Sequence, residues 1–377
     1  MKILIIGNPT SIYTKYYVQK VLAPLEARIY LNCNQELDSA DVTFYKHANV
    51  EFVNLYKTSG ILKKIPRIST IRAYIKNLKD LAGKEKFDYI QIHSIGNPGL
   101  MRFAYKALKK NTNCLILTFW GSDILNIDNK RAKQIKNLIK VADKIVLSTK
   151  TMKERFRFYY GDSYDHKIKS RLFGNSIIEH NVYLKENSIK LTSDNKRKSE
   201  KYIVAIGYNG SKRQQHLNVI NELGKLDEIN KAKLHLIIQM SYGSPDGLYK
   251  NEIMAAMKTA SLEGEIIEKY LTMDETIRLR KSVDLFINGQ ITDALSSSVL
   301  EYMYFGAEVL NPNWISYEEW RDLGIIYNEY DKFEDIASYV IELLEGRTYT
   351  PHENNVKIIE ENFTWNSVAP TWRKLFE

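Results

Sequence analysis

Apolar residues along this chain fall into short uninterrupted runs separated by longer periodic stretches. Runs such as residues 2–6 and 202–206 are typical of strands buried on both faces, whereas the periodic stretches are typical of helices. Alternation of the two predicts an α/β fold, with parallel sheets covered by helices on both faces. The predicted strands are 2–6, 89–93, 114–119, 144–148, 202–206, 234–239 and 283–287, and the clearest predicted helices are 13–25, 216–226, 252–260 and 296–304.

The pattern restarts near the middle of the chain. A length of 377 residues exceeds one ordinary domain and suits two. The polar segment 185–200 predicts a linker between a first domain, 1–184, and a second domain that begins at residue 201. Two doubly wound domains of this kind are expected to bring the carboxyl ends of their strands to a shared central cleft.

The number of cysteines and the length of the apolar segments limit the classes of protein to which this chain can belong. Cys33 and Cys114 are the only cysteines, and both lie beside strand-like runs, so we expect no disulfide framework and a reducing compartment. No apolar segment approaches the length that spans a bilayer, and the run at residues 1–7 stops at Gly7 before it could form a signal peptide. We therefore expect a cytoplasmic protein, soluble or peripheral on the membrane.

The net charge of +9 hides an uneven distribution. Residues 1–200 hold 36 Lys plus Arg against 18 Asp plus Glu, and residues 201–377 hold 18 against 27, so the halves carry +18 and −9. This asymmetry indicates that the first half meets an anionic partner.

The most informative motif is residues 292–310, TDALSSSVLEYMYFGAEVL. Asp293 and Glu301 are carboxylates with seven residues between them, and residues 296–298 are three serines at the start of a predicted helix. A strand, a loop and a helix N-terminus in this order present amides and a positive dipole end that suit a phosphate group. Alternatively, the serines only cap a core helix and both acids are solvated.

The same motif resembles the signature of the large retaining glycosyltransferase family 4, in which two glutamates seven residues apart precede a small-residue turn. Here the first glutamate is Asp293, and Tyr302 stands before Met303 where the family has Ala. This resemblance implies the GT-B fold, two Rossmann-like domains, with the nucleotide-sugar donor in the second domain, 201–360. It also implies that the tail, 361–377, is a helix that crosses back to the first domain.

Further segments extend the resemblance and imply site residues. FDYIQIH and LILTFWGSD resemble first-domain segments of the family, which assigns His93 and Asp123 to the catalytic cleft. AIGYNGSKRQQH resembles the segment that grips the donor diphosphate. On this basis the implied catalytic residues are Asp293, Glu301, His93 and Asp123, and the implied donor-binding residues are Gly207, Lys212, Arg213, Ser296, Ser297, Ser298 and Glu301. Trp120 stands where many members have histidine.

Each first-domain candidate has a structural alternative. His93 is one of seven histidines and ends an apolar strand, so a structural role is open. Asp123 follows Gly121-Ser122 and could cap the next helix. Trp120 could be core packing or a ring that stacks on a sugar. Lys212 and Arg213 could face solvent, although they follow a glycine-bearing strand exit.

A second resemblance concerns the stereochemistry. The segment QMSYGSPDGLYKNEI and the absence of a strict glutamate pair resemble the bacterial fucosaminyltransferases of common-antigen assembly, which invert the anomeric centre. The sequence therefore leaves retention and inversion open.

A basic amphipathic pattern occupies residues 60–86. Apolar residues recur at helical spacing among basic ones, and docking to anionic lipid is one interpretation, with each Lys or Arg near the surface adding about 1 kcal/mol. The other is an ordinary domain helix, because Pro66 interrupts the pattern.

These features favour a glycosyltransferase that moves a sugar from a nucleotide-sugar to a saccharide or lipid-linked saccharide acceptor in cell-envelope or capsule assembly. No Asp-x-Asp pair occurs, so no metal and no cofactor are expected. A nucleotide-sugar epimerase or hydrolase on the same fold is the first alternative. A basic nucleic-acid-binding protein is the second, and the acidic second half argues against it.

Overall fold

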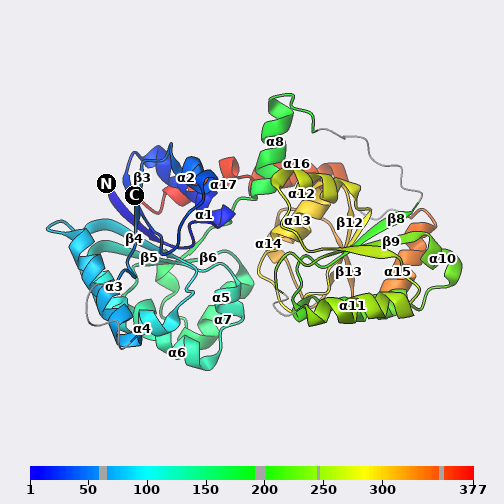
Figure 1. The fold of residues 1–377 in the computed structure, drawn as a ribbon, viewed down its shortest axis with the longest axis horizontal. Coiled ribbons are helices and arrows are strands. Elements are labelled where there is room, and N and C mark those ends of the chain that lie inside the picture. The colour runs from blue at the N-terminus through cyan, green and yellow to red at the C-terminus, as the bar shows by residue number, and fades with distance from the viewer. Residues whose placement is uncertain (59–65, 192–200, 244–246, 348–351) are drawn as a thin grey trace. The chain divides into compact units, whose positions relative to one another are not determined.

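The computed structural model describes residues 1–58, 66–191, 201–243, 247–347 and 352–377. These residues form two compact units, 1–176 with 365–377 and 177–364 (Figure 1). Each unit contains one parallel sheet with helices, which confirms the predicted α/β fold with two doubly wound domains.

The sheet of the first unit has the order β3-β2-β1-β4-β5-β6-β7 among the described residues. Every neighbouring pair is parallel. Ile3, Leu4 and Ile5 are fully buried because the central strands have helices on both faces. The strands are β1 (Lys2–Ile6), β2 (Arg28–Asn32), β3 (Val50–Val53), β4 (Phe87–His93), β5 (Thr112–Thr118), β6 (Lys144–Leu147) and β7 (Ile168–Ser170).

Two helical layers cover this sheet. Figure 1 shows α3, α4 and α6 on one face and α1, α2 and α17 on the other, and the packing of α4 on α3 and α6 and of α17 on α1 agrees with it. The predicted helix 13–25 is α1 followed by a π-helical and a 3₁₀ segment that end at Leu25. The helices are α1 (Ile12–Tyr17), α2 (Ser39–Tyr45), α3 (Pro66–Ala82), α4 (Pro98–Lys110), α5 (Ser122–Leu125), α6 (Asn129–Val141), α7 (Lys150–Tyr160) and α17 (Trp365–Arg373).

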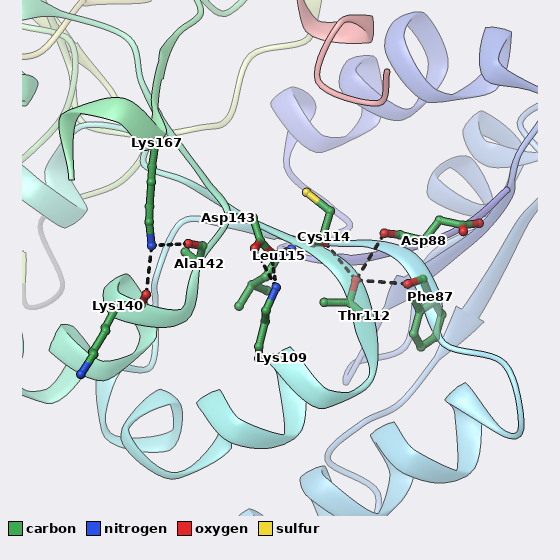
Figure 2. A network of polar contacts seen from close by, with 10 residues as sticks. All are labelled: Phe87, Asp88, Lys109, Thr112, Cys114, Leu115, Lys140, Ala142, Asp143 and Lys167. Carbon is green, nitrogen blue, oxygen red and sulfur yellow. Dashed lines mark hydrogen bonds and ion pairs between the residues drawn. The ribbon is translucent and has the colours of Figure 1, made fainter.

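A polar network ties the beginnings of β4, β5 and β6 together (Figure 2). The Asp143 carboxylate accepts the Leu115 amide at 2.7 Å and two contacts from Lys109 Nζ at 2.7 and 2.6 Å. Thr112 donates its hydroxyl to the Cys114 carbonyl at 2.9 Å, and Lys167 Nζ donates to the Ala142 carbonyl at 2.7 Å. This network lies at the amino ends of the strands, so it serves the sheet and leaves the carboxyl edge to other residues.

The sheet of the second unit has the order β10-β9-β8-β11-β12-β13 among the described residues, again parallel throughout. Its core lies between the sheet and α9, α11 and α15, while α12, α13 and α16 pack together as another layer. The strands are β8 (Tyr202–Ile206), β9 (Leu234–Gln239), β10 (Gly264–Ile267), β11 (Leu285–Ile287), β12 (Glu308–Pro312) and β13 (Asn328–Tyr330). The helices are α8 (Ser176–Glu186), α9 (His216–Leu223), α10 (Glu228–Ala232), α11 (Leu248–Thr259), α12 (Met273–Ser282), α13 (Ser297–Tyr304), α14 (Glu318–Asp322), α15 (Asp335–Leu344) and α16 (His352–Phe363).

The chain passes between the units at residues 176–177 and 364–365. The first passage comes before the predicted boundary at residue 184, because side chains of α8 beyond Ser176 are hydrogen-bonded to residues of the second unit. Asn181 and Lys185 donate to the Tyr304 hydroxyl at 3.0 and 3.1 Å, and His180 Nε2 lies 2.8 Å from Asp274. Most of the predicted linker, residues 192–200, lies outside the described residues.

The tail divides between the units at Thr364. Helix α16 belongs to the second unit, and α17 packs in the first unit. There Trp372 Nε1 donates to the Leu172 carbonyl at 2.7 Å and Trp365 Nε1 donates to Ser176 at 3.2 Å.

Candidate functional site

The loops that follow β8, β9 and β11 pack against one another at the carboxyl edge of the second sheet. A Cβ atom on Gly289 would lie 2.4 Å from the Gln214 carbonyl oxygen, and one on Gly243 would lie 2.9 Å from the Ser211 nitrogen. Gly207 has a φ of 63°, and its Cβ would lie 2.7 Å from His216 Nε2. These contacts leave no room for a side chain, so the glycines allow the three loops to meet.

Asp293 lies in this loop group, and two phenols hold its carboxylate. Tyr208 donates its hydroxyl to Asp293 Oδ2 at 2.9 Å and Tyr317 does so at 3.2 Å, while the Ala294 amide donates to Oδ1 at 2.8 Å. Asp293 keeps some exposed surface, but its carboxylate is enclosed. Burial raises the pKa of this carboxyl above its usual range. Three polar groups from three segments of the chain thus fix the position of one carboxylate.

Glu301 lies deeper, on α13, in a buried ion pair. Arg280 Nε donates to Glu301 Oε2 at 3.2 Å, and the two residues are 3% and 6% exposed. Arg280 Nη1 also donates to Gln239 Oε1 and to the Tyr302 hydroxyl, both at 2.6 Å. Because these partners come from β9, α12 and α13, the pair holds together the elements beneath the loop group.

The two predicted cations have different surroundings. Arg213 Nη2 donates to the Thr292 hydroxyl at 2.7 Å, and the Arg213 carbonyl accepts the Ile291 amide at 3.1 Å, so Arg213 adjoins the loop that carries Asp293. Lys212 is exposed and pairs with Glu252 on α11 at 3.1 Å. The structure therefore brings Arg213 toward Asp293 and directs Lys212 to a different helix.

The three serines stand at the N-terminus of α13, as the sequence predicts. Ser296 is the N-cap, and its side chain accepts the Val299 amide at 3.3 Å. Ser297 and Ser298 form the first turn and are partly exposed. The first turn of α13, with its free amides and the positive end of the helix dipole, begins four residues after Asp293 in the chain.

His93 and Asp123 lie in the first unit. The Asp123 carboxylate accepts the amides of Trp120, Gly121 and Ile95 at 2.9, 3.1 and 3.2 Å. It therefore joins the loop after β4 to the loop after β5. This structural role is close to the helix-capping role that the sequence left open for Asp123. Although these amides favour its charged form, burial is the larger effect and raises the pKa of Asp123.

His93 ends β4 inside an aromatic cluster. Its ring centroid lies 4.5 Å from that of Tyr17, 6.0 Å from that of Trp120 and 6.5 Å from that of Phe173. The residue is 2% exposed, and neither ring nitrogen has a hydrogen-bond partner among the described residues. Burial lowers the pKa of His93 to about 3, so the ring is neutral at ordinary pH.

Sequence reasoning missed Arg280, Tyr208 and Tyr317, which position the two predicted carboxylates. They lie 21, 85 and 24 residues from their partners in the chain, and no local pattern marks them. The available signal was indirect, because an acid that faces the interior of a helix layer requires a buried partner.

The described residues contain no group of three or more His, Cys, Asp or Glu side chains arranged to hold a metal ion. None of their helices combines the length and the apolar character that crossing a bilayer requires.

Comparison with known proteins relates the fold to carbohydrate enzymes. Residues 2–149 match the family described as Glycosyl transferase 4-like. No curated protein matches the chain.

Similar solved structures extend over the whole chain. HepE of Anabaena, in complex with UDP and glucose, is 14% identical with a TM-score of 0.70, and the match covers 100% of this chain and 99% of HepE. Sucrose-phosphate synthase of Thermosynechococcus elongatus is 12% identical, with a TM-score of 0.70 and coverage of 100% and 98%. A glycosyltransferase of Rickettsia africae is 15% identical, with a TM-score of 0.69 and coverage of 100% and 97%. At these identities the likeness shows the fold, which is GT-B.

Proposed function

We propose that this protein is a glycosyltransferase that moves a sugar from a nucleotide-sugar donor to a saccharide or lipid-linked saccharide acceptor. The observation that carries the proposal is the grouping of an enclosed carboxylate, a cation and a helix N-terminus at one sheet edge, in Asp293, Arg213 and α13. The match of residues 2–149 to a Glycosyl transferase 4-like family supports it, as does the GT-B fold.

Arg213 and the first turn of α13 have the chemistry to bind the donor diphosphate. A guanidinium and helix amides donate charge-assisted hydrogen bonds to phosphate oxygens, and the same groups stabilise the charge that develops as the diphosphate departs. In this proposal Gly207 lets the β8 loop approach the phosphates, and donor binding does not depend on a divalent cation.

Asp293 and Glu301 act on donor hydroxyls in the proposal. Tyr208 and Tyr317 orient the Asp293 carboxylate, whose remaining lone pairs accept from hydroxyls of the transferred sugar. Arg280 orients Glu301, which contacts a hydroxyl on the nucleotide side. The family 4 resemblance supports retention at the anomeric carbon, with a leaving-group oxygen that helps to deprotonate the acceptor.

The first test measures donor binding. The purified protein is titrated with UDP, GDP, ADP and dTDP, with and without chelator. Loss of Arg213 in Arg213→Ala should weaken nucleoside diphosphate binding by about 10- to 150-fold, because a hydrogen bond to a charged group contributes about 1.5–3 kcal/mol. Lys212→Ala is the matched control and should weaken it less, since Glu252 already pairs with Lys212.

Two results would contradict the proposal. One is unchanged affinity in the variant that carries both Arg213→Ala and Lys212→Ala. The other is a strict magnesium requirement for nucleotide binding. NMR of the anomeric proton in the product decides the stereochemistry, and an inverted product removes only the retaining part of the proposal.

The proposed acceptor belongs to assembly of cell envelope or capsular polysaccharide. Support comes from the +18 charge of residues 1–200, which favours a cytoplasmic protein that docks its first half on an anionic leaflet. A lipid-linked acceptor head group stays close to such a surface, so docking would bring enzyme and acceptor together.

A further inference from the structure

A hollow of about 630 Å³ lies at the outer edge of the second sheet, where residues of α11 and of the edge strand β10 line it. Helix α11 runs along one face of that sheet (Figure 1), and β10 pairs only with β9 among the described residues. The volume is within the range of about 300–1,000 Å³ that small-molecule pockets occupy. The residues that line the hollow all differ from those assigned to the donor, so it is a separate feature of the molecule.

The floor of the hollow is apolar. Met254 and Met257 lie three residues apart on α11 and so share one face of the helix. Leu262 follows the turn at the end of α11, and Ile266 lies in β10. Met257 and Leu262 are 7% and 5% exposed, whereas Met254 is 52% exposed. Because methionine side chains adapt to irregular apolar partners, this floor suits a flexible hydrocarbon.

The carboxyl end of α11 presents little negative charge to the hollow. The Ser261 amide donates to the Lys258 carbonyl at 3.2 Å, and the Leu262 amide donates to the Met257 carbonyl at 3.0 Å. These bonds occupy carbonyls at the end of the helix that would otherwise repel an anion.

Two of the charged groups at the rim already have counter-ions. Lys250 pairs with Glu268. Glu263 pairs with Lys201 at 2.5 Å, and this contact lowers the pKa of the Glu263 carboxyl, which keeps it ionised. Each of these pairs is neutral as a whole, so neither gives the hollow a net charge.

We propose that the hollow binds a fatty carboxylate, with the alkyl chain on the apolar floor and the carboxylate beside Lys258. Within the described part of the chain the Lys258 ammonium has no ion pair, so the rim has one cation left to neutralise. The His235 ring lines the same hollow and supplies a further N–H donor. An apolar floor and an unpaired cation together select an amphipathic anion, since a bare hydrocarbon would leave the charge unmatched and a small anion would leave the floor in water.

The test titrates the whole protein, labelled with ¹³C at its methionine methyl groups, with monomeric decanoate. The Met254 and Met257 signals should shift and saturate, whereas those of Met152 on α7 and Met303 on α13 should stay in place. Octanoate and hexanoate should bind more weakly by about two- to fourfold for each CH₂ removed, because less apolar surface is buried. Acetate lacks the chain and should cause no saturable shift. Decyltrimethylammonium reverses the charge and should bind at least about tenfold more weakly than decanoate.

Two variants separate the rim from the floor. Lys258→Glu should weaken decanoate binding by about fivefold or more. Lys357→Glu makes the same charge change at an exposed position on α16 of the same unit, so it is the matched control and should stay within about twofold of the wild type. Met254→Gln changes an exposed part of the floor and should both weaken binding and reduce the gain for each CH₂.

Several results would overturn the proposal. One is decanoate that leaves the Met254 and Met257 signals unmoved. Others are an affinity that does not change with chain length, equal binding of decyltrimethylammonium, or equal weakening by Lys258→Glu and Lys357→Glu. A response of the two methyl groups to anionic vesicles but not to monomeric decanoate would make the hollow a membrane contact instead. None of these outcomes bears on nucleotide binding, so the proposed function is tested separately.

Discussion

Arg280 and Glu301 form an ion pair from which water is almost excluded. Removing one member of a buried pair leaves an uncompensated charge and costs about 3–5 kcal/mol, whereas removing both members together is often close to neutral. This asymmetry distinguishes the pair from the many exposed ion pairs of the chain, such as Arg347 with Glu342 at a similar 3.1 Å.

Arg280→Met should therefore lower the free energy of unfolding by about 3–5 kcal/mol, as measured by urea denaturation. Adding Glu301→Gln to the same chain should recover part of the loss, because the unpaired charge is then absent. Arg347→Met is the control and should change stability by less than about 1 kcal/mol. A loss in Arg280→Met no larger than in this control would contradict the prediction.

The buried His93 ring predicts sensitivity to mild acid. Its pKa is about 3 in the folded protein and about 6.5 when unfolded, so below pH 6.5 only the unfolded state takes up the proton. Its contribution is complete above pH 6.5 and decreases as the pH falls toward 3. His216, whose pKa burial lowers to about 4, acts in the same direction.

Between pH 7.5 and pH 5.5 the wild type should lose about 1.4 kcal/mol of stability through His93 alone. His93→Phe, which suits the aromatic surroundings, should lose that much less over the same interval, as measured by urea denaturation at the two pH values. The exposed His166 supplies the control variant His166→Gln. Equal pH dependence in His93→Phe and the wild type would show that the ring is not neutral in the fold.

At the scale of elements, the network in Figure 2 joins the beginnings of β5 and β6 through Asp143. Leu115 is fully buried, so loss of the Asp143 acceptor leaves its amide as a buried donor without a partner. This costs about 1–3 kcal/mol of stability. The Lys109 contact to the same carboxylate is more than a third exposed, and such pairs contribute about 0–1 kcal/mol.

Asp143→Ala should accordingly destabilise the protein by more than Lys109→Met, which removes only the ion pair. Amide hydrogen exchange supplies the second measurement, in which protection of the Leu115 amide should fall in Asp143→Ala and persist in Lys109→Met. Equal destabilisation by the two variants would mean that the ion pair, and not the amide contact, stabilises this edge of the sheet.

At the scale of the whole molecule, the +18 and −9 halves favour opposite behaviour at an anionic surface. The basic amphipathic stretch that motivates docking is described only in part. Helix α3 covers residues 66–82, whereas Lys63 and Lys64 lie outside the described residues. Lys76 on α3 pairs with Asp80 at 2.5 Å on the exposed face of the helix.

Binding to liposomes should require anionic lipid, weaken at high salt, and fall when Lys63, Lys64, Arg67 and Lys76 are all replaced by Glu. A variant with the same charge change on α6, at Lys130, Arg131, Lys133 and Lys136, controls for net charge. Sedimentation with vesicles provides the measurement. Absence of binding to anionic vesicles at low salt would make a soluble glycan or a protein the favoured acceptor.

The positions of several strands and the start of α13 could be predicted from the sequence alone. β1, β8 and β9 lie at the predicted residues because runs of consecutive apolar side chains suit strands buried on both faces. α13 begins where expected, since the Ser296 hydroxyl caps an amide only three residues away. Two doubly wound domains followed from the repeated alternation of such elements.

Contacts between distant residues were decided by the tertiary structure. Asp293 was recognised as a candidate, but its partners Tyr208 and Tyr317 become neighbours only when β8, β11 and the segment before α14 meet at one edge. The passage between units at residue 176 and the Arg280–Glu301 pair have the same origin. Periodicity and capping act over a few residues, whereas pairing of buried charges and stacking of rings depend on which loops the fold brings together.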